Sequence, residues 1–139
     1  MSQLPDDTPL HKVSIPGTHD TGALHGGRIC ETQRWTVAEQ LRAGIRFLDI
    51  RCRRDGTSFA IHHGFCFQKM YFEDVLRDVS MFLASSPGET ILMRVKEEYI
   101  PRAGSSSLQA IWDSYMDEFG TLFEQSALAG IPTLGSVRG

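Results

Sequence analysis

The chain has 139 residues, of which 41% are hydrophobic and 22% are charged, and its net charge is −3. This composition is typical of a globular domain with a buried core, and a net negative charge argues against the broad basic surface of a nucleic-acid-binding protein. No apolar run is long enough to cross a bilayer, and the polar, acidic start at Met1–Asp7 has no signal-peptide pattern. We therefore expect neither a transmembrane segment nor a signal peptide in this sequence, which does not indicate a cellular compartment.

The first predicted elements are a strand, a short helix and a second strand. Leu10–Ile15 is rich in apolar residues and is followed by a Pro-Gly turn signal, which predicts a strand. Thr36 and Glu39 form a capping-box pattern and Gly44 is a helix stop, so a helix is expected between them. Ile45–Cys52 is apolar at first and polar at its end, which predicts a buried strand.

Two more strands and two helices follow. A turn signal precedes Ser58–His62, a short predicted strand, and Glu89–Lys96 is predicted as the fourth. One helix is expected from Tyr71 and another over Leu108–Leu122, because the apolar residues there have helical spacing. These residues are Phe72, Val75, Leu76, Val79, Phe82 and Leu83 in the first helix and Leu108, Ile111, Trp112, Tyr115, Phe119 and Leu122 in the second.

The segment Phe65–Tyr71 has two interpretations. Its apolar residues beside a lysine suit contact with a lipid surface. Alternatively, these residues begin the following helix and pack in the core, which is the outcome that we expect.

The three cysteines are Cys30, Cys52 and Cys66. Their odd number and irregular spacing argue against a disulfide framework and against a zinc site. Small buried thiols are the expected state, and one disulfide with one thiol left over is the alternative.

The order of the elements is mostly that of an α/β protein with parallel strands. The short loop between the second and third strands is the exception, since a tight turn joins antiparallel strands. Four strands amount to about half of a (β/α)₈ barrel, which typically needs about 250 residues.

Titratable side chains fall at the end of every predicted strand. In barrels and open α/β sheets the chemistry lies at the C-terminal ends of the strands, so this pattern indicates a functional site. The residues are His19 and Asp20 after the first strand, Asp49 and Arg51 in the second, His62 and His63 in the third, and Lys96, Glu97 and Glu98 in the fourth.

These residue types suit the cleavage of a phosphodiester without a metal. Two histidines can act as general base and general acid near neutral pH. An arginine binds phosphate through two hydrogen bonds and stabilises developing charge, and a lysine adds a mobile point charge. Each residue also has a structural interpretation: a histidine at a strand end is often an ordinary hydrogen-bonding group, and Asp49 and Arg51 could form a structural ion pair.

Four motifs in the chain carry a family resemblance. They are Ser14–Asp20 (SIPGTHD), Gly44–Arg51 (GIRFLDIR), Ile61–Gly64 (IHHG) and Glu89–Tyr99 (ETILMRVKEEY). In this order they resemble the X domain of phosphatidylinositol-specific phospholipases C in its bacterial-type form. The resemblance runs from about Leu10 to the last residues, Thr133–Gly139.

The resemblance implies a role for each residue of the acid–base pair. His19 matches the general base that activates the inositol 2-hydroxyl, which attacks the adjacent phosphorus and gives a cyclic inositol phosphate. His63 matches the general acid that protonates the departing diacylglycerol oxygen. Arg51 matches the arginine that stabilises the phosphate. His62, like His11 and His25, matches no catalytic residue and is expected to be structural or on the surface.

The remaining site residues and the cofactor expectation also come from the resemblance. Asp20 and Asp49 match supporting carboxylates, and Lys96 matches a residue that contacts the inositol ring. Calcium-dependent relatives carry an acidic ligand in the place of Arg51, so the resemblance implies that no calcium, other metal or cofactor is needed.

The resemblance further implies a phosphoinositide substrate, a possible peripheral contact with a membrane, and a TIM-barrel fold. Residues 1–139 are expected to be a single partial catalytic domain of the X type, ending before the fifth strand. An aspartate that partners the first histidine and further inositol contacts would then lie outside the chain.

The alternative is an inactive fragment, or a non-catalytic remnant that binds phosphate or membrane. A metal-dependent glycerophosphodiesterase, with the same fold, would need a His-Arg-Gly opening and paired acidic ligands, which the sequence lacks.

Overall fold

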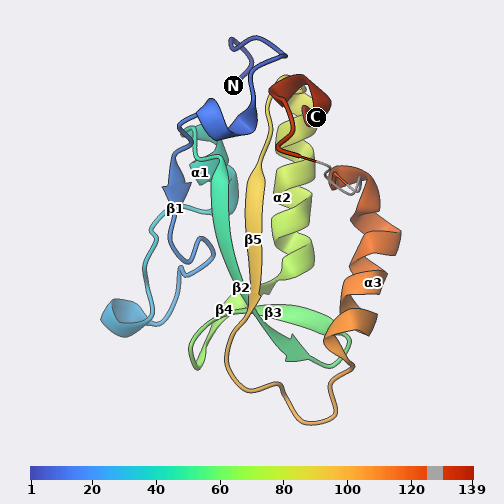
Figure 1. The fold of residues 1–139 in the computed structure, drawn as a ribbon. Coiled ribbons are helices and arrows are strands. Elements are labelled where there is room, and N and C mark those ends of the chain that lie inside the picture. Colours follow the sequence, from blue (N-terminus) through green and yellow to red (C-terminus); the bar gives the residue numbers. More distant parts are fainter. Residues whose placement is uncertain (125–129) are drawn as a thin grey trace.

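The computed structural model describes residues 1–124 and 130–139 as one mixed sheet with three main helices (Figure 1). The strands are β1 (Gly17–Thr18), β2 (Phe47–Asp55), β3 (Ser58–His63), β4 (Cys66–Tyr71) and β5 (Leu92–Glu97), and the helices are α1 (Val37–Arg42), α2 (Phe72–Ser85) and α3 (Leu108–Phe119). No helix among the described residues is long and apolar enough to span a membrane.

Strand β2 is the centre of the sheet. Its first residues pair in parallel with β1, and its length from Phe47 to Cys52 pairs in parallel with β5. Its last residues turn at Gly56, which has a φ of 62°, and pair antiparallel with β3. The parallel pattern and its antiparallel exception are therefore both confirmed.

The first strand differs from its prediction. Leu10–Lys12 forms a 3₁₀ turn, and the strand is the two-residue β1 after the proline. The backbone N–H of Leu10 donates to the carbonyl of Pro132 at 3.0 Å, and that of Leu134 donates to Thr8 at 2.9 Å. The apolar residues near Leu10 are thus tied to the C-terminal turn and are not available to the sheet.

The segment Phe65–Tyr71 is also different, because it contains the strand β4 and not the start of a helix. It pairs antiparallel with β3 through a turn at Gly64, and Lys69 lies in the left-handed region where the register shifts. The expectation of core packing was wrong for Phe65 and Phe67, which are 66% and 41% exposed. A six-residue strand interrupted by an irregularity does not show a clear period of two in the sequence.

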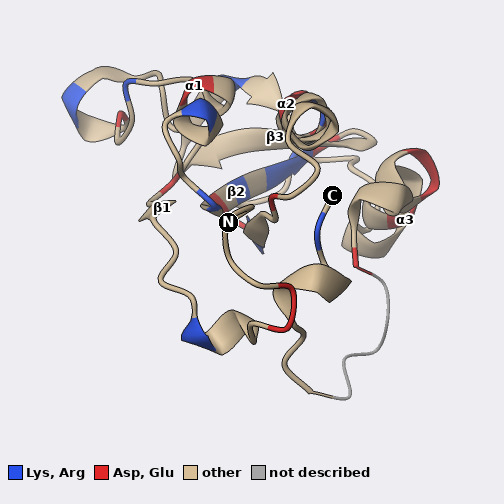
Figure 2. Ribbon diagram, turned by 90° about the horizontal axis from the view of Figure 1, so that it is seen from above, with Lys and Arg blue, Asp and Glu red and all other residues tan. Residues whose placement is uncertain are grey.

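The two faces of β2 have different roles. Leu48, Ile50 and Cys52 point to one face and are buried against the helices, whereas Asp49 and Arg51 alternate with them and point to the other. In Figure 2, α1 and α2 lie on one side of β2 and the segments near the termini lie on the other. The apolar core is therefore on the helical side, and the opposite face of the sheet is free for polar side chains.

The start of α1 follows from the predicted signal, whereas α3 ends at Phe119 and its predicted last residues, up to Leu122, form a 3₁₀ turn. The Thr36 hydroxyl accepts a hydrogen bond from the Glu39 backbone N–H while the Glu39 carboxylate accepts one from that of Thr36, so the predicted capping box is present at α1. Helix α2 places its apolar stripe on the sheet, where Phe72 is fully buried and contacts the rings of Phe59 and Tyr115.

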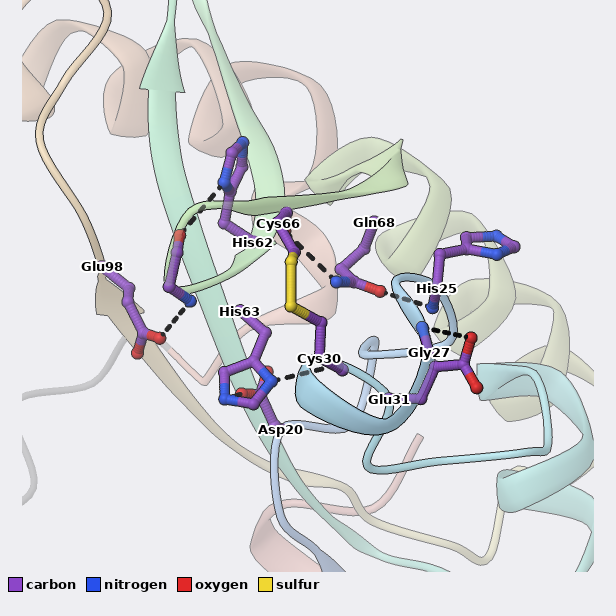
Figure 3. Close-up of a disulfide and its surroundings, with 11 residues drawn as sticks. Asp20, His25, Gly27, Cys30, Glu31, His62, His63, Cys66, Gln68 and Glu98 are labelled. Atoms are coloured by element: carbon purple, nitrogen blue, oxygen red, sulfur yellow. Dashed lines mark hydrogen bonds and ion pairs between the residues drawn. A yellow bond between two sulfur atoms is a disulfide. The ribbon is translucent and has the colours of Figure 1, made fainter.

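The cysteines correct another expectation. Cys30 and Cys66 form a disulfide, and Cys52 is a free, buried thiol (Figure 3). The alternative of one disulfide with one thiol left over is thus what the structure contains. The fold brings the loop after β1 against the β3–β4 hairpin, and a separation of 36 residues gave no local signal for that pairing.

His62 is a packed residue of the sheet and does not point into the polar face. It is 4% exposed, its ring lies between those of Phe67 and Tyr99, and its Nδ1 is 3.3 Å from the carbonyl oxygen of Gly64. Burial lowers the pKa of His62, and the contact with the Gly64 carbonyl opposes this effect. The structural role expected for this histidine agrees with its position.

This burial predicts a loss of stability in mild acid. Because the pKa of His62 is lower in the folded chain than in the unfolded chain, the unfolded chain takes up the proton first, and stability is lost as the pH falls below about 6.5. One such group contributes at most about 1.4 kcal/mol per pH unit. His62→Phe keeps an aromatic ring at this position but cannot take up a proton. The free energy of unfolding in urea should therefore change less between pH 7.5 and 5 in this variant than in the unmutated protein. The exposed His11→Asn is the control, and equal pH dependence in all three proteins would contradict the expectation.

Candidate active site

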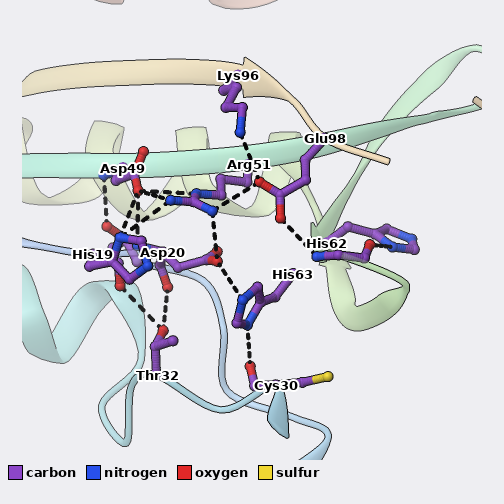
Figure 4. Close-up of polar contacts among 12 residues, drawn as sticks. His19, Asp20, Cys30, Thr32, Asp49, Arg51, His62, His63, Lys96 and Glu98 are labelled. Carbon is purple, nitrogen blue, oxygen red and sulfur yellow. Dashed lines mark hydrogen bonds and ion pairs between the residues drawn. The ribbon is translucent and has the colours of Figure 1, made fainter. Parts of the chain in front are cut away.

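A polar cluster forms on the face of the sheet opposite the helices (Figure 4). Three segments far apart in the sequence supply most of it: the loop after β1, the middle of β2, and the end of β5 with the residue that follows. The parallel register sets Arg51 beside Lys96 and Asp49 beside Arg94. The polar cluster consists of His19, Asp20, Asp49, Arg51, His63, Arg94, Lys96 and Glu98.

Arg51 is the centre of the polar cluster. Its Nε lies 3.1 Å from Asp49 Oδ2, its Nη1 lies 3.0 Å from Glu98 Oε2, and its Nη2 lies 3.3 Å from His19 Nδ1. The side chain is only 15% exposed. Burial acts to lower the pKa of Arg51, but the three nearby carboxylates outweigh it and raise the pKa. The guanidinium is therefore a fixed positive charge.

Asp49 accepts hydrogen bonds from several directions. Its Oδ2 accepts from Arg51 and from the backbone N–H of Asp20 at 3.2 Å, and its Oδ1 accepts from Arg94 Nη1 at 3.2 Å. Burial tends to raise the pKa of Asp49, but these donors outweigh it and lower the pKa. His19, whose side chain is 64% exposed, has its Nδ1 3.3 Å from the same Oδ2. The carboxylate can thus orient the ring of His19 and stabilise its protonated form.

Asp20 is the residue whose surroundings are most unusual. It is fully buried, its φ of 50° lies in the left-handed region, and neither carboxylate oxygen accepts a hydrogen bond from the residues that the structure describes. Its Oδ2 lies 3.6 Å from His63 Nε2 and 3.7 Å from Arg51 Nη1. Burial raises the pKa of Asp20, although His63 and Arg51 oppose the rise. Strained, unsatisfied groups of this kind are concentrated at functional sites.

His63 comes from the end of β3 and is held from both sides. Its Nδ1 lies 3.0 Å from the backbone carbonyl oxygen of Cys30, and its Nε2 faces Asp20. A carbonyl only accepts hydrogen bonds, so Nδ1 must carry a proton. Nε2 is therefore the nitrogen that is available for proton transfer.

Two residues belong to the polar cluster although their roles were not predicted. Glu98 Oε1 accepts from the backbone N–H of Gly64 at 2.8 Å, and its Oε2 lies 3.4 Å from Lys96 Nζ, so it ties the hairpin to β5. Burial tends to raise the pKa of Glu98, but the Gly64 N–H and Arg51 outweigh it and lower the pKa. Arg94 is the second residue whose role was not predicted. The sequence contained a signal for both residues, because positions 94, 96 and 98 share one face of a strand.

The predicted site residues His19, Asp20, Asp49, Arg51, His63 and Lys96 are all in the polar cluster. Lys96 is at its margin, with a side chain that is 44% exposed. The ion pair of Asp49 with Arg51, considered above as a structural alternative, is also present.

Three residues of the polar cluster have potential ligand atoms close enough together to share a metal ion. Atoms of Asp20, His63 and Glu98 all lie within 4.8 Å of one another. The guanidinium of Arg51 contacts two of these three residues, at 3.7 Å from Asp20 and 3.0 Å from Glu98. A cation of the protein itself thus lies beside these carboxylates, and a divalent ion would have to bind against its charge.

An apolar cavity of about 590 Å³ lies away from the polar cluster, between β5 and the helices. It is on the face of the sheet opposite to Arg51. The residues around it include Leu76, Val79, Met93, Val95, Trp112 and Phe123. The described residues that line the cavity are mostly apolar and include no histidine, lysine or arginine. The polar cluster has all three residue types and is therefore the candidate active site.

Comparison with known proteins agrees with the geometry. The sequence model described as "Phosphatidylinositol-specific phospholipase C, X domain" matches residues 7–139. The chain is 37% identical to the 1-phosphatidylinositol phosphodiesterase of Listeria monocytogenes over 147 residues, covering 100% of this chain and 45% of that protein. It is 32% identical to the protein of the same name from Staphylococcus aureus over 105 residues, covering 71% of this chain and 34% of that protein.

Solved structures show the same relationship. A structure of phosphatidylinositol-specific phospholipase C from S. aureus superimposes with a TM-score of 0.91 at 28% identity, over 99% of this chain and 48% of that one. The enzyme from L. monocytogenes superimposes with a TM-score of 0.79 at 33% identity, over 99% and 52%. Another S. aureus structure concerns the modulation of membrane binding by that enzyme. The fold is thus a mixed α/β half-barrel that matches about half of these structures.

The chain spans less than half the length of the curated relatives named here. Nearly all of its own residues nevertheless take part in the match. The chain belongs to the family of the phosphatidylinositol-specific phospholipase C X domain.

Proposed function

We propose that this chain supplies the acid–base and phosphate-binding groups of a phosphodiesterase that cleaves a phosphoinositide into diacylglycerol and a cyclic inositol phosphate. One observation carries the proposal: a largely buried arginine lies beside His19 and shares Asp20 with His63. A phosphate bound by the guanidinium would therefore have one imidazole on the side of the attacking oxygen and another on the side of the leaving oxygen.

His19 is proposed as the general base. Its Nδ1 faces Asp49 and Arg51, so its exposed Nε2 is free to take the proton of the inositol 2-hydroxyl. As that oxygen forms a bond to phosphorus, the ring becomes an imidazolium. The carboxylate of Asp49 stabilises this charge, as an orienting acid does in other base-activated nucleophiles.

Arg51 and His63 act on the other side of the reaction. Negative charge grows on the non-bridging oxygens as the new bond forms, and a fixed guanidinium is already oriented to stabilise it. The bond from phosphorus to the glycerol oxygen breaks, and His63 Nε2 gives its proton to that oxygen. Asp20, which faces Nε2 at 3.6 Å, favours the protonated ring before the transfer. Lys96, with an exposed ammonium, is assigned to the inositol hydroxyls.

Activity of the whole protein is part of this proposal, because the relatives are about twice as long as the chain. We treat residues 1–139 as a partial catalytic domain of the X type. The 139-residue chain is assayed alone and as a chimaera with the C-terminal part of the Listeria relative, using ³¹P NMR to detect cyclic inositol phosphate. Turnover by the chimaera supports the proposal. We expect little turnover by the chain alone, and no turnover by a folded chimaera would favour the alternative of a non-catalytic remnant.

Contact with a membrane surface is the second part of the proposal, because a phosphoinositide lies in a bilayer. Ile29 and Phe65 are 79% and 66% exposed, and each immediately precedes one half of the disulfide that lies beside His63. Exposed apolar side chains of this kind insert into the boundary between head groups and acyl chains.

Replacement of both apolar residues should weaken this contact. Ile29→Ser with Phe65→Ser should lower the affinity for phosphatidylinositol-containing vesicles, measured by sedimentation, by at least about tenfold, because each buried apolar side chain is worth about 1.5–3 kcal/mol. Met81→Ser is the control, since Met81 is 63% exposed on α2, away from the polar cluster. Equal sedimentation of the double variant and the control would reject the contact.

The histidine pair gives the next prediction. His19→Ala and His63→Ala should each lower turnover by roughly 10²–10⁴-fold, the usual contribution of general acid–base catalysis. His62→Phe should retain most of the turnover, because His62 packs between two aromatic rings outside the polar cluster. Rates are compared for variants that keep the wild-type circular dichroism. An inactive His62 variant beside an active His63 variant would reverse the assignment.

Metal independence is the last prediction from this proposal. Arg51 provides a fixed positive charge beside Asp20 and Glu98, so turnover should survive EDTA unchanged. Arg51→Lys should lower turnover strongly, because an ammonium cannot bind a phosphate through two parallel hydrogen bonds. The measurement is the rate with EDTA, with EDTA and excess calcium, and with neither. Loss of turnover in EDTA that calcium restores would refute the expectation.

A further inference from the structure

The disulfide lies beside the proposed general acid and not in a remote part of the fold. Figure 3 shows Cys30 and Cys66 with His63 next to them. Cys66 is the residue paired with His63 across the β3–β4 hairpin. Cys30 is in the loop after β1, and its backbone carbonyl is the group that contacts His63 Nδ1 at 3.0 Å. One half of the disulfide thus pairs with His63 across the hairpin, and the other half contacts the imidazole from the loop opposite.

The loop is shaped around this covalent link. Gly26 has a φ of 107°, and a Cβ atom there would lie 2.6 Å from Cys30 Cβ and 3.3 Å from each of the two sulfur atoms. A side chain at Gly26 would therefore clash with the disulfide. The fully buried Gln68 adds a second tether, because its Oε1 accepts from the backbone N–H of His25 at 2.7 Å while its Nε2 donates to the Cys66 carbonyl at 3.2 Å.

The same loop also carries other parts of the polar cluster. The Thr32 hydroxyl lies 3.1 Å from the carbonyl oxygen of Asp20, and Gln33 Nε2 donates to the carbonyl of His19 at 2.7 Å. These bonds hold the N-terminal end of the loop to its C-terminal end. The Cys30–Cys66 link is the covalent connection between this loop and the hairpin of His63 among the residues that the structure describes.

We propose that the Cys30–Cys66 disulfide is a positioning element for His63, which makes the proton-transfer step sensitive to redox state. This inference rests on the proposed function of His63 as general acid. With the link intact, the Cys30 carbonyl keeps the proton of the neutral ring on Nδ1 and directs Nε2 to the reacting oxygen. A dithiol reductant gives two electrons and two protons to the disulfide, which becomes two cysteine thiols while the dithiol becomes a cyclic disulfide. The carbonyl is then no longer fixed against the ring.

A positioning role and a merely structural role differ in which substrates are affected. A general acid matters for an alkoxide leaving group, which is a strong base, and matters little for an aryl leaving group such as p-nitrophenolate, which leaves without a proton. Loss of the link through a general loosening of the fold would slow both kinds of substrate equally.

The first experiment therefore compares two leaving groups in the sample that shows turnover in the assay above. Cys30→Ala with Cys66→Ala should slow cleavage of phosphatidylinositol by about tenfold, short of the roughly 10²–10⁴-fold effect of removing the acid, and should leave cleavage of a p-nitrophenyl inositol phosphate within about twofold. Reduction of the unmutated protein by a dithiol should have the same effect, and reoxidation should restore the rate. Cys52→Ala is the control, because Cys52 is buried in the core and outside the disulfide. Equal effects on both substrates, or none on either, would overturn the proposal.

The second experiment does not depend on turnover. In the 139-residue chain, ¹⁵N NMR of the histidine rings should show His63 with its neutral-form proton on Nδ1 when the disulfide is intact. This signature should be lost on reduction, while that of His62 is kept. If no sample turns over either substrate, the proposed function fails, and this measurement still decides the positioning role. An Nδ1–H signature that persists after reduction would overturn it.

Discussion

The polar cluster depends on the ionic contacts of a single guanidinium. Arg51 is nearly buried and meets Asp20, Asp49 and Glu98 at 3.7, 3.1 and 3.0 Å. Removal of one partner from a buried ion pair leaves an uncompensated charge and costs about 3–5 kcal/mol, so these carboxylates and the arginine constrain one another. Arg94 and Lys96 bring the formal balance of the cluster to three acidic and three basic side chains. In the proposed reaction, an arriving phosphate would therefore meet an arginine that its ionic partners already hold in place.

The sheet topology explains how one strand can serve this arrangement. Strand β2 is parallel to β1 and β5 but antiparallel to β3, so the ends of three neighbours converge on the stretch from Asp49 to Arg51. The parallel neighbours bring His19, Asp20 and Lys96 to this point by their chain direction. The antiparallel strand β3, which returns along β2 from the turn at Gly56, brings His63, and Glu98 accepts a hydrogen bond from the N–H of the next residue, Gly64. The apolar residues that alternate with Asp49 and Arg51 pack against the helices on the other face of β2. This packing keeps the side chains of the polar cluster on a rigid support.

The sequence predicted those parts that depend on local signals. The capping box of α1, the apolar stripe of α2 and the polar ends of β2 and β5 are all local patterns, and the family motifs supplied the choice of His63 over His62. What it did not predict depends on pairing between distant segments. Leu10 bonds to Pro132, β4 exists because it pairs with β3, and Cys30 meets Cys66 only once the loop is folded. Glu98 was visible as a strand-end acid, but its partners Arg51 and Gly64 become evident only in three dimensions.

Asp20 shows why such a site can tolerate a costly residue. A buried carboxylate without hydrogen bonds is unfavourable, and its backbone φ of 50° adds strain. Among the residues that the structure describes, its ion-pair partners are Arg51 and, when that ring is protonated, His63. If a bound phosphate forms an ion pair with Arg51, His63 becomes the main remaining counter-ion for Asp20. The phosphate itself also adds a second negative charge beside the ring of His63. Substrate binding would thus favour a proton on His63, the proposed general acid. In the proposed reaction, the unsatisfied carboxylate would couple the charge of the substrate to the protonation of His63, which a fully hydrogen-bonded aspartate would do less strongly.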